Sequence, residues 1–394
     1  MNSKPPLVPL VRPALGEAEV DNAARVIRSG WVTQGPEVLA FERELATWLD
    51  TPHAAAVANC TVALELALRT LGVGPGDEVI TASHSFVATA NAIVAVSAKP
   101  VFVDVVAATW GLDPLLIEPA ITSRTKAILV VHQLGLPCDI LAIVDVANRF
   151  GLAVVEDAAC AIGSEICVEG RWEKIGRPRG HIACFSFHPR KVLTTGDGGL
   201  LTTRDPVLDA RFRLLRQHAM SISDVKRHSS DEIVFEEYLE PAFNHRMTDL
   251  QAAIGRSQLA RLDATISERR RLAQIYADAL VDNAVFVAPA DPPSARSNWQ
   301  SYPVKIRPGV KLSQREIMQL FLAAGIATKR GVSNSHQEPA YRDGQRARFG
   351  ALPVSEHLRD DVVLLPLFHG MSGSEQSRVT AVCAALHEEE KSSR

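Results

Sequence analysis

The chain is predicted to have an α/β fold in which helices cover both faces of a large, mostly parallel sheet, followed by a smaller C-terminal α/β unit. Strand-like apolar runs alternate with helical patterns from residue 53 to residue 204, and this alternation is typical of βαβ units. A length of 394 residues exceeds the size at which one hydrophobic core keeps growing, so two domains are expected. The apolar content of 46% and the charged content of 22% are those of an ordinary globular protein.

The elements of the first domain follow from short apolar runs, which are interpreted as buried strands, and from longer segments with helical periodicity. In chain order they are a strand at residues 54–57, a helix at 61–71, a strand at 78–81, a helix at 88–97, strands at 101–105 and 127–131, a helix at 140–150, and strands at 152–155 and 182–187. A Gly-Pro-Gly-Asp turn at residues 74–77 separates the first helix from the second strand.

A long charged helix at residues 249–280 is expected to carry the chain away from this sheet. Three prolines between residues 289 and 293 mark a linker-like stretch before a strand at 302–306 and a helix at 313–324. The sequence therefore predicts a large domain at residues 1–255 and a small C-terminal domain at residues 256–394, and the tail from residue 388 is expected to be frayed.

Composition excludes several classes of protein. The net charge of −3 argues against a nucleic-acid-binding protein, which would carry a clustered basic excess, and the basic run 269–271 is interpreted as a solvated face of the long helix. The six cysteines have neither C-x-x-C spacing nor zinc-like spacing with histidine, so most are expected to be buried thiols in a reducing compartment, and no metal site is predicted. No apolar stretch follows the N-terminus, and the longest apolar region, 88–106, is broken by polar residues. A cytoplasmic protein without a membrane span is therefore expected.

Two polar residues at strand ends form the candidate catalytic pair. Asp157 closes the apolar run 152–155, and Lys191 follows the run 182–187, ahead of a glycine-rich turn. Ligand groups in open α/β sheets come from the carboxyl ends of strands. A pyridoxal phosphate (PLP) enzyme needs these two groups, because a lysine amine forms a Schiff base and a carboxylate keeps the pyridinium nitrogen protonated. Taken singly, Asp157 would be interpreted as a turn or helix cap and Lys191 as a solvated loop residue.

The segments that carry this pair, 156–163 and 185–199, resemble the two signature segments of the DegT/StrS family of PLP-dependent sugar aminotransferases. Further matches follow in order along nearly the whole chain, at residues 30–36, 74–79, 132–137, 244–249 and 338–342. The resemblance implies the aspartate-aminotransferase fold type I, with PLP as the cofactor. It also implies a homodimer with shared active sites that moves an amino group from an amino acid, glutamate or glutamine, to a keto sugar that is expected to be nucleotide-linked.

The resemblance assigns the residues that would bind the cofactor. Cys60 and Thr61 lie between a predicted strand and a predicted helix, where a helix N-terminus can bind a phosphate, although the family usually has glycine where this chain has Cys60. Ser186 matches a phosphate-binding serine, and Phe86 matches an aromatic residue that stacks on the pyridine ring. Without the resemblance, Thr61, Ser186 and Phe86 would be interpreted as a helix cap, a strand serine and a core residue. Cys160 stands where the family commonly has glutamine or histidine, which bind the phenolic oxygen better than a thiol does.

Residues outside the first signature segments are assigned in the same way. Asn244 matches a residue that reaches the phosphate from the neighbouring subunit, whereas by itself it would be interpreted as a turn residue. The candidate substrate-binding residues, which lie where relatives face the substrate, are Lys329, Arg330, His336 and Tyr341. The two cations could contact a nucleotide diphosphate, and a solvated surface pair is the alternative for them.

Three alternatives to a sugar aminotransferase remain open. A dehydratase branch of the family replaces the lysine, typically by histidine, and Lys191 argues against it. The second alternative keeps the chemistry but aminates a cyclitol ketone or a similar antibiotic precursor. The third is a regulatory protein that binds PLP or a sugar without turnover, and Cys60 and Cys160 are the departures from the family pattern that keep it open.

Overall fold

The computed structural model describes residues 6–222, 233 and 235–392. Within these residues the largest element is an eight-stranded sheet with the order β1-β9-β8-β5-β4-β2-β3-β14. Its strands are β1 His53–Val57, β2 Glu78–Ala82, β3 Lys99–Val103, β4 Thr125–Val131, β5 Ala153–Asp157, β8 Ile182–Ser186, β9 Gly199–Thr203 and β14 Arg348–Phe349. In this described part of the chain, β9 alone runs against its neighbours, so the prediction of a mostly parallel sheet is confirmed.

Helices cover both faces of this sheet. One face packs against α2 (Pro36–Trp48), α5 (Ile140–Phe150) and α8 (Asp249–Leu259), and the other against α3 (Cys60–Thr70), α4 (Ala88–Ala95) and α6 (Pro206–Leu215). Along β4, Ile128 and Val130 join the first cluster of buried residues, whereas Leu129 joins the second. Successive side chains of a strand point to opposite faces, so an uninterrupted apolar run is the pattern of a strand that is buried on both.

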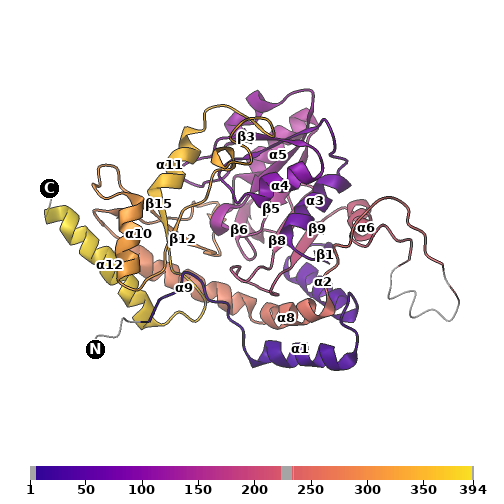
Figure 1. The fold of residues 1–394 in the computed structure, drawn as a ribbon, viewed down its shortest axis with the longest axis horizontal. Coiled ribbons are helices and arrows are strands. Elements are labelled where there is room, and N and C mark those ends of the chain that lie inside the picture. Colours follow the sequence, from indigo (N-terminus) through magenta and orange to yellow (C-terminus); the bar gives the residue numbers. More distant parts are fainter. Residues whose placement is uncertain (1–5, 223–232, 234, 393–394) are drawn as a thin grey trace.

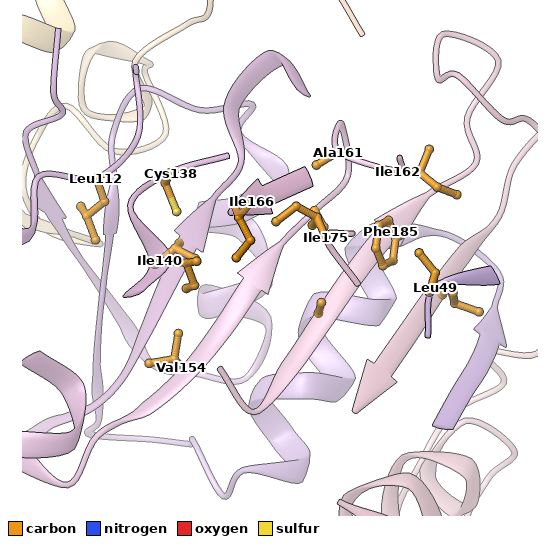
Figure 2. Packing of buried hydrophobic residues seen from close by; sticks show 14 of the residues in the cluster. Leu49, Leu112, Cys138, Ile140, Val154, Ala161, Ile162, Ile166, Ile175 and Phe185 are labelled. Atoms are coloured by element: carbon orange, nitrogen blue, oxygen red, sulfur yellow. The ribbon is translucent and has the colours of Figure 1, made fainter. Parts of the chain in front are cut away.

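Packing on the first face is close. Figure 2 shows Leu49, Ile175 and Phe185 gathered at one end of this cluster. Gly176 lies beside them with a φ of 113°, and a Cβ atom there would come within 2.7 Å of Phe185 Cζ and 2.8 Å of Leu49 Cδ2. Glycine is therefore required at this position both by its backbone conformation and by the space available.

A second unit has its own sheet and core. Its sheet has the order β10-β12-β15-β13, and its elements are α9 Leu262–Ala279, β10 Phe286–Val287, β12 Tyr302–Ile306, α10 Gln314–Ala323, β13 Lys329–Arg330, β15 Val362–Leu365 and α12 Gly373–Ser392. Figure 1 shows α9 leading from α8 toward α10 and α12, at the side of the molecule where both termini lie. Tyr276, Tyr302 and Phe321 are fully buried in the core of this unit.

Some segments cross between the two units. Val8 bridges Ile326 and is buried in the second core, whereas β14 extends the large sheet by pairing with β3. α11 (Pro353–Asp361) begins against the large sheet, where Asp104 accepts hydrogen bonds from the backbone of its first turn. The predicted domain boundary at residue 255 falls within α8. Each of the two units contains residues from both sides of this position, so the boundary stays a prediction.

The expectation of one long helix at residues 249–280 is wrong. The segment forms α8 and α9, separated at Ala260–Arg261. Arg261 there donates to Ala14 O at 2.6 Å and lies 2.7 Å from Glu19 Oε1, an N-terminal residue of α1 (Glu17–Ser29). No proline or glycine stands at the break, and Arg261 is held there by contacts with a segment that is distant in the sequence.

Two smaller expectations are also wrong. Arg269 is not part of a solvated face, because its guanidinium is buried and donates to the main-chain oxygens of Trp299, Gln300 and Leu367. The tail is helical as far as Ser392, and residues 393–394 lie outside the described part of the chain.

The remaining elements are short. A three-stranded sheet has the order β11-β6-β7, and its strands are β6 Glu165–Val168, β7 Arg171–Lys174 and β11 Ala295–Arg296. Single 3₁₀ turns lie at η1 Pro114–Leu116, η2 Glu118–Ala120, η3 Gln133–Gly135 and η4 Ser335–Gln337. All six cysteines are free thiols, and four of them (Cys60, Cys138, Cys184, Cys383) are buried, as expected. None of the described helices combines the length and the apolar character that crossing a membrane requires.

Candidate active site

The candidate site lies at the carboxyl edge of the large sheet. β5 ends at Asp157 and β8 at Ser186, and these parallel neighbours place Asp157 opposite Cys184. β1 ends at Val57 on the same edge, because Gly199 of β9 pairs with both Val57 and Ser186. α3 begins immediately after β1, so its first turn lies at the edge where ligands bind in such sheets.

The Asp157 carboxylate is buried, with 5% of the residue exposed. Its Oδ2 accepts a hydrogen bond from Thr89 Oγ1 at 2.8 Å and its Oδ1 accepts one from Ala159 N at 3.1 Å. Burial raises the pKa of Asp157 above its ordinary value, although these hydrogen bonds and the charge of Lys191 oppose the increase. The positive charges near Asp157 therefore do not fully offset the cost of burying its carboxylate. A protonated ring nitrogen of bound PLP would add a further positive charge beside it.

Lys191 lies in the loop between β8 and β9, where its backbone N donates to His188 O at 2.8 Å. Its Nζ donates to Cys160 Sγ at 3.1 Å. Burial lowers the pKa of the Lys191 amine, but the contact with Cys160 and the negative charge of Asp157 outweigh burial and hold that pKa above its ordinary value. The structure thus brings the two predicted catalytic groups into one electrostatic environment, with Cys160 in direct contact with the amine.

A buried histidine and a buried glutamate lie behind Asp157. His132 Nε2 is 3.1 Å from Glu156 Oε2, and His132 N donates to Asp157 O at 3.0 Å. Burial alone would lower the pKa of His132, but the contacts with Cys138 and Glu156 outweigh it and raise the pKa to about 10. The imidazolium charge is one of the influences that favour an ionised Asp157.

The residues predicted to meet the phosphate lie at the start of α3. Asn59 caps this helix by accepting a hydrogen bond from Val62 N at 3.1 Å, and Thr61 is exposed in the first turn. The first N–H groups of a helix have no partners within it and can bind an anion. Burial, together with the charge of Asp157, raises the pKa of Cys60 well above its ordinary value. The Cys60 thiol therefore stays neutral and does not repel a phosphate.

Phe86 and Ser186 complete this set. Phe86 is 69% exposed, which excludes the core interpretation and leaves its ring available for stacking. The carbonyl oxygen of Phe86 accepts a hydrogen bond from Thr89 N at 3.1 Å. Phe86 therefore lies one turn before Thr89, the residue whose hydroxyl binds Asp157. Ser186 is buried, and its Oγ accepts a long 3.4 Å hydrogen bond from His188 N.

Asn244 is exposed and takes part in local hydrogen bonds. Its Oδ1 accepts from Arg246 N at 3.3 Å and from Arg246 Nε at 3.1 Å. The next residue, His245, accepts from Ala58 N at 2.8 Å, so this segment lies beside the entry to α3 of its own chain. The prediction that Asn244 serves a neighbouring subunit stays a prediction, with its own chain as the competing possibility.

The predicted substrate residues fall into two groups. Lys329 and Arg330 form β13, and Arg330 lies 3.9 Å from Glu338. Partial burial and then the positive charge of Arg190 lower the pKa of Lys329, and the charge of Lys191 acts in the same direction. Lys329 is therefore close enough to the lysine loop to share its electrostatic environment.

His336 and Tyr341 are held by contacts with the large sheet domain. His336 Nδ1 is 2.6 Å from Ser83 Oγ, and its Nε2 is 3.1 Å from Glu356 Oε1. The Tyr341 hydroxyl donates to Asn91 Oδ1 at 2.6 Å. Both side chains are buried, and the structure does not bring them into contact with Lys191. Their contact with a substrate stays a prediction.

Sequence reasoning missed three residues that contact the site. Thr89 binds Asp157 and lies three residues after Phe86. A hydroxyl one helical turn after a residue that is predicted to stack on the cofactor could have indicated a second contact with the site. Asn298 and Gln300 bind the loops that carry Cys160 and Lys191. No local pattern could have identified them, because the Gln300 contact spans 108 positions of sequence.

The residues gathered at this edge of the sheet fit PLP. Within the described residues, no group of three or more histidine, cysteine or acidic side chains is placed to bind a metal ion. The features that fit PLP are the Lys191 amine, the incompletely compensated Asp157 carboxylate, the exposed Phe86 ring and the first turn of α3. A surface hollow of about 510 Å³ near Lys99 and Arg124 lies at the amino ends of β2 and β3, away from this edge.

Comparison with known proteins gives matches over nearly the whole chain. The sequence model of the DegT/DnrJ/EryC1/StrS aminotransferase family matches residues 13–384. The chain is 35% identical over 392 residues to the UDP-4-amino-4-deoxy-L-arabinose–oxoglutarate aminotransferase of Shewanella sediminis (strain HAW-EB3), a match that covers 96% of this chain and 98% of that protein.

Solved structures agree with this match. DesV from S. venezuelae superposes with a TM-score of 0.88 at 34% identity and covers 98% of this chain and 99% of its own. Spr1654 from Streptococcus pneumoniae, solved in a PLP form and a PMP form, superposes with TM-scores of 0.87 and 0.88 at 27% and 28% identity. Each of these two structures covers 98% of this chain and 100% of its own.

Proposed function

The chain belongs to the DegT/DnrJ/EryC1/StrS aminotransferase family, and from this premise we propose that it transfers the amino group of an amino acid, glutamate or glutamine, to a keto sugar carried on a nucleotide. Family membership makes the protein a PLP-dependent aminotransferase of fold type I, as predicted from the sequence. The observation that carries the proposal is the convergence of Lys191 and Asp157 at the carboxyl edge of the sheet, with Cys160 Sγ 3.1 Å from the amine. The sugar acceptor is supported by the name of the Shewanella relative.

Each residue is proposed to have a separate task. Bound PLP supplies an electron sink for chemistry at the carbon that bears the amino group. Lys191 Nζ would hold the cofactor between turnovers and, once free, would move a proton from the α-carbon of the donor to the imine carbon of the cofactor, with the reverse transfer to the acceptor carbon in the second half-reaction. Asp157 holds a proton on the ring nitrogen. Thr61, Ser186 and the N-terminus of α3 bind the phosphate, and Phe86 stacks on the ring.

Amine transfer provides the direct test. Enzyme loaded with pyridoxamine phosphate is offered a panel of nucleotide keto sugars and cyclitol ketones, and the aminated products are identified by mass spectrometry. Amination of a nucleotide keto sugar is expected. Amination of a cyclitol ketone alone would establish the alternative acceptor, and an enzyme that exchanges amines with glutamate but with no ketone on the panel would contradict the proposed acceptor class. Binding of PLP without any turnover would favour the regulatory alternative.

The two cations of β13 are the best candidates for binding a diphosphate. Replacing Lys329 and Arg330 together with alanine is expected to raise KM for the nucleotide sugar by about a hundredfold or more, since each of the two charge-assisted hydrogen bonds contributes roughly 1.5–3 kcal/mol. The half-reaction with the amino donor is expected to be unaffected, because the donor has no diphosphate. Steady-state kinetics for each half-reaction measure both effects.

Lys305→Ala is the matched control, because it removes a cation from β12 of the same sheet, which β15 separates from β13. This variant is expected to leave both half-reactions unchanged. Unaltered kinetics in the double variant with the true acceptor would remove Lys329 and Arg330 from the site and favour an acceptor without a diphosphate.

We infer that the active enzyme is a homodimer whose sites combine residues of both subunits. Mixing the inactive variants Lys191→Ala and Asn244→Asp is expected to restore activity, to at most about a quarter of the wild-type value for random pairing of equal amounts. The physical reason is that one site of the mixed dimer receives both lesions and the other receives neither. Activity of the mixture measures the effect, and the purified mixed dimer is expected to reach at most about half of the wild-type value because one of its two sites is intact.

Two tags, one on each variant, establish that subunits have exchanged. A mixed dimer that is isolated with both tags and remains inactive would show that Asn244 acts within its own chain, beside the entry to α3, or has no role in the site. Wild-type subunits carrying the same tags control for any effect of tagging on activity.

A further inference from the structure

The segment Asn298–Gln300, which follows β11 and precedes β12, contacts the loop that carries Lys191. Gln300 Oε1 accepts a hydrogen bond from Val192 N at 3.0 Å, and Gln300 Nε2 donates to Arg190 O at 2.5 Å. These two backbone groups stand on either side of Lys191. One buried amide side chain therefore fixes the main chain immediately before and after the reacting lysine.

The same segment also holds the loop that carries Cys160. Asn298 Nδ2 donates to Cys160 O at 2.9 Å and to Ile162 O at 2.8 Å, while Asn298 Oδ1 accepts from Gln300 N at 2.8 Å. Asn298 is fully buried and Gln300 is 5% exposed. The hydrogen bonds thus form a continuous path between the two loops whose side chains meet at the 3.1 Å contact of Cys160 with Lys191.

A buried cation anchors the segment from the second unit of the chain. Arg269 of α9 donates to Trp299 O through Nε and Nη2, at 2.9 and 2.7 Å, and to Gln300 O at 2.8 Å. Within the described part of the chain, the hydrogen-bond partners of this guanidinium are main-chain oxygens and include no carboxylate. Trp299 has a φ of 52°, a conformation that persists in a non-glycine residue only where surrounding contacts enforce it. The main chain of the segment is therefore held in one conformation.

We propose that Gln300 and Asn298 are positioning residues for Lys191, and that they align the amine with Cys160 and Asp157 from a part of the chain beyond α9. The inference rests on the proposed role of Lys191. Its physical basis is that a reacting group displaced by about 1 Å can lose about a hundredfold in rate. Two hydrogen bonds that flank a residue restrain its Cα more tightly than packing of the side chain alone.

Three variants test the inference. Gln300→Leu removes both hydrogen bonds with little change in volume, and Gln300→Glu keeps the acceptor for Val192 N but loses the donor to Arg190 O. Gln376→Leu is the matched control, because Gln376 is also buried but donates to Leu272 O, between α12 and α9. A purely structural role for Gln300 predicts the same behaviour in Gln300→Leu and in this control.

The first measurement is hydrogen exchange of the peptide that contains Val192, with and without PLP. Gln300→Leu is expected to accelerate this exchange by about tenfold or more, Gln300→Glu by less, and Gln376→Leu not at all. The second measurement is the half-reaction with the amino donor. Gln300→Leu is expected to lower its rate constant by about tenfold to a hundredfold per bound PLP, with a change in donor KM of less than about threefold. Gln300→Glu is expected to fall between Gln300→Leu and the wild type.

The inference is overturned if Gln300→Leu exchanges and turns over within about twofold of the wild type, or if Gln376→Leu shows equal losses. If Gln300→Leu does not fold, Gln300→Glu decides by the same two measurements. A wild-type enzyme that binds PLP but does not attach it to Lys191 would defeat the proposed function instead. A wild type labelled at Lys191, with unchanged Gln300 variants, would defeat this inference alone.

Discussion

Asp157→Asn is expected to lower turnover by about a hundredfold to ten-thousandfold, the range for losing one preorganised charge at a developing ionic centre. An amide cannot hold a proton on the ring nitrogen as a carboxylate does. The substitution preserves shape, and the amide oxygen can still accept from Ala159 N, as Asp157 Oδ1 does at 3.1 Å. The loss is therefore expected in the rate constant per bound PLP, measured by single-turnover kinetics with the donor.

The melting temperature of Asp157→Asn distinguishes a loss of catalysis from a loss of folding. Since burial raises the pKa of Asp157 in the ligand-free chain, its ionised form is less favoured in the folded than in the unfolded state at neutral pH. The asparagine variant is therefore expected to melt at the same or a higher temperature without PLP, and to gain less stability than the wild type when PLP is added.

Asp104→Asn provides a matched control at the same edge of the sheet. Asp104 is a buried carboxylate that accepts from Val354 N and Ser355 N at 2.9 and 2.8 Å, which makes it structural. This variant is expected to lower the melting temperature while the folded enzyme keeps its turnover. Near-normal turnover of Asp157→Asn with PLP bound would contradict the role assigned to Asp157.

Lys191→Ala is expected to abolish transamination while PLP still binds through Thr61, Ser186 and Asp157. General acid–base catalysis alone contributes about 10²–10⁴-fold, and this variant also loses covalent attachment of the cofactor. Borohydride treatment of the wild type followed by peptide mapping is expected to place the reduced cofactor on Lys191. The variant is expected to release PLP on dialysis and to carry no adduct after the same treatment.

Lys174→Ala controls for the loss of a lysine elsewhere. Lys174 Nζ donates to Trp48 O at 2.8 Å and lies 4.0 Å from the centre of the Trp48 ring, so its replacement is expected to affect stability only. Partial recovery of Lys191→Ala by a small primary amine would support the proton-transfer role, because the amine would replace the missing Nζ. An adduct on any lysine other than Lys191 would refute the assignment.

The sequence predicts the parts of the fold that depend on local pattern. The apolar run at 127–131 corresponds to β4, and the run at 182–187 to β8, because strands buried on both faces have no polar interruption. β6 and β7 were not predicted, since Glu169 and Gly170 form their turn with φ values of 49° and 79°, and glutamate is an unusual residue at a positive φ. The break between α8 and α9 has no proline or glycine to signal it, and the contacts of Arg261 at the break, with Ala14 and Glu19, join segments far apart in the sequence.

In the candidate site, too, the features that depend on local sequence pattern could be predicted and those that depend on tertiary contacts could not. Asp157 and Lys191 could be predicted because Asp157 ends one strand that the pattern identifies and Lys191 lies in the loop after another, and the family resemblance assigned their partners in the signature segments. The charge environment of the amine could not be predicted, since it depends on the Sγ of Cys160 approaching Nζ across two loops. Arg269 was misassigned because a run of three arginines is usually solvated, and only tertiary structure supplies the carbonyl oxygens that bind a buried guanidinium.

The pairing of β14 with β3 has a consequence for how the protein is made. β3 lies between β2 and β14, so it is the outer strand of the sheet until Arg348 and Phe349 have been synthesised. An outer strand offers unpaired N–H and C=O groups to other chains, and proteins of this size fold while synthesis proceeds. A nascent or truncated chain that ends before residue 348 thus carries an open edge at which two copies can aggregate. The two residues that cover part of this edge, by pairing with Val101 and Phe102, therefore lie about 250 positions further along the chain than the strand they pair with.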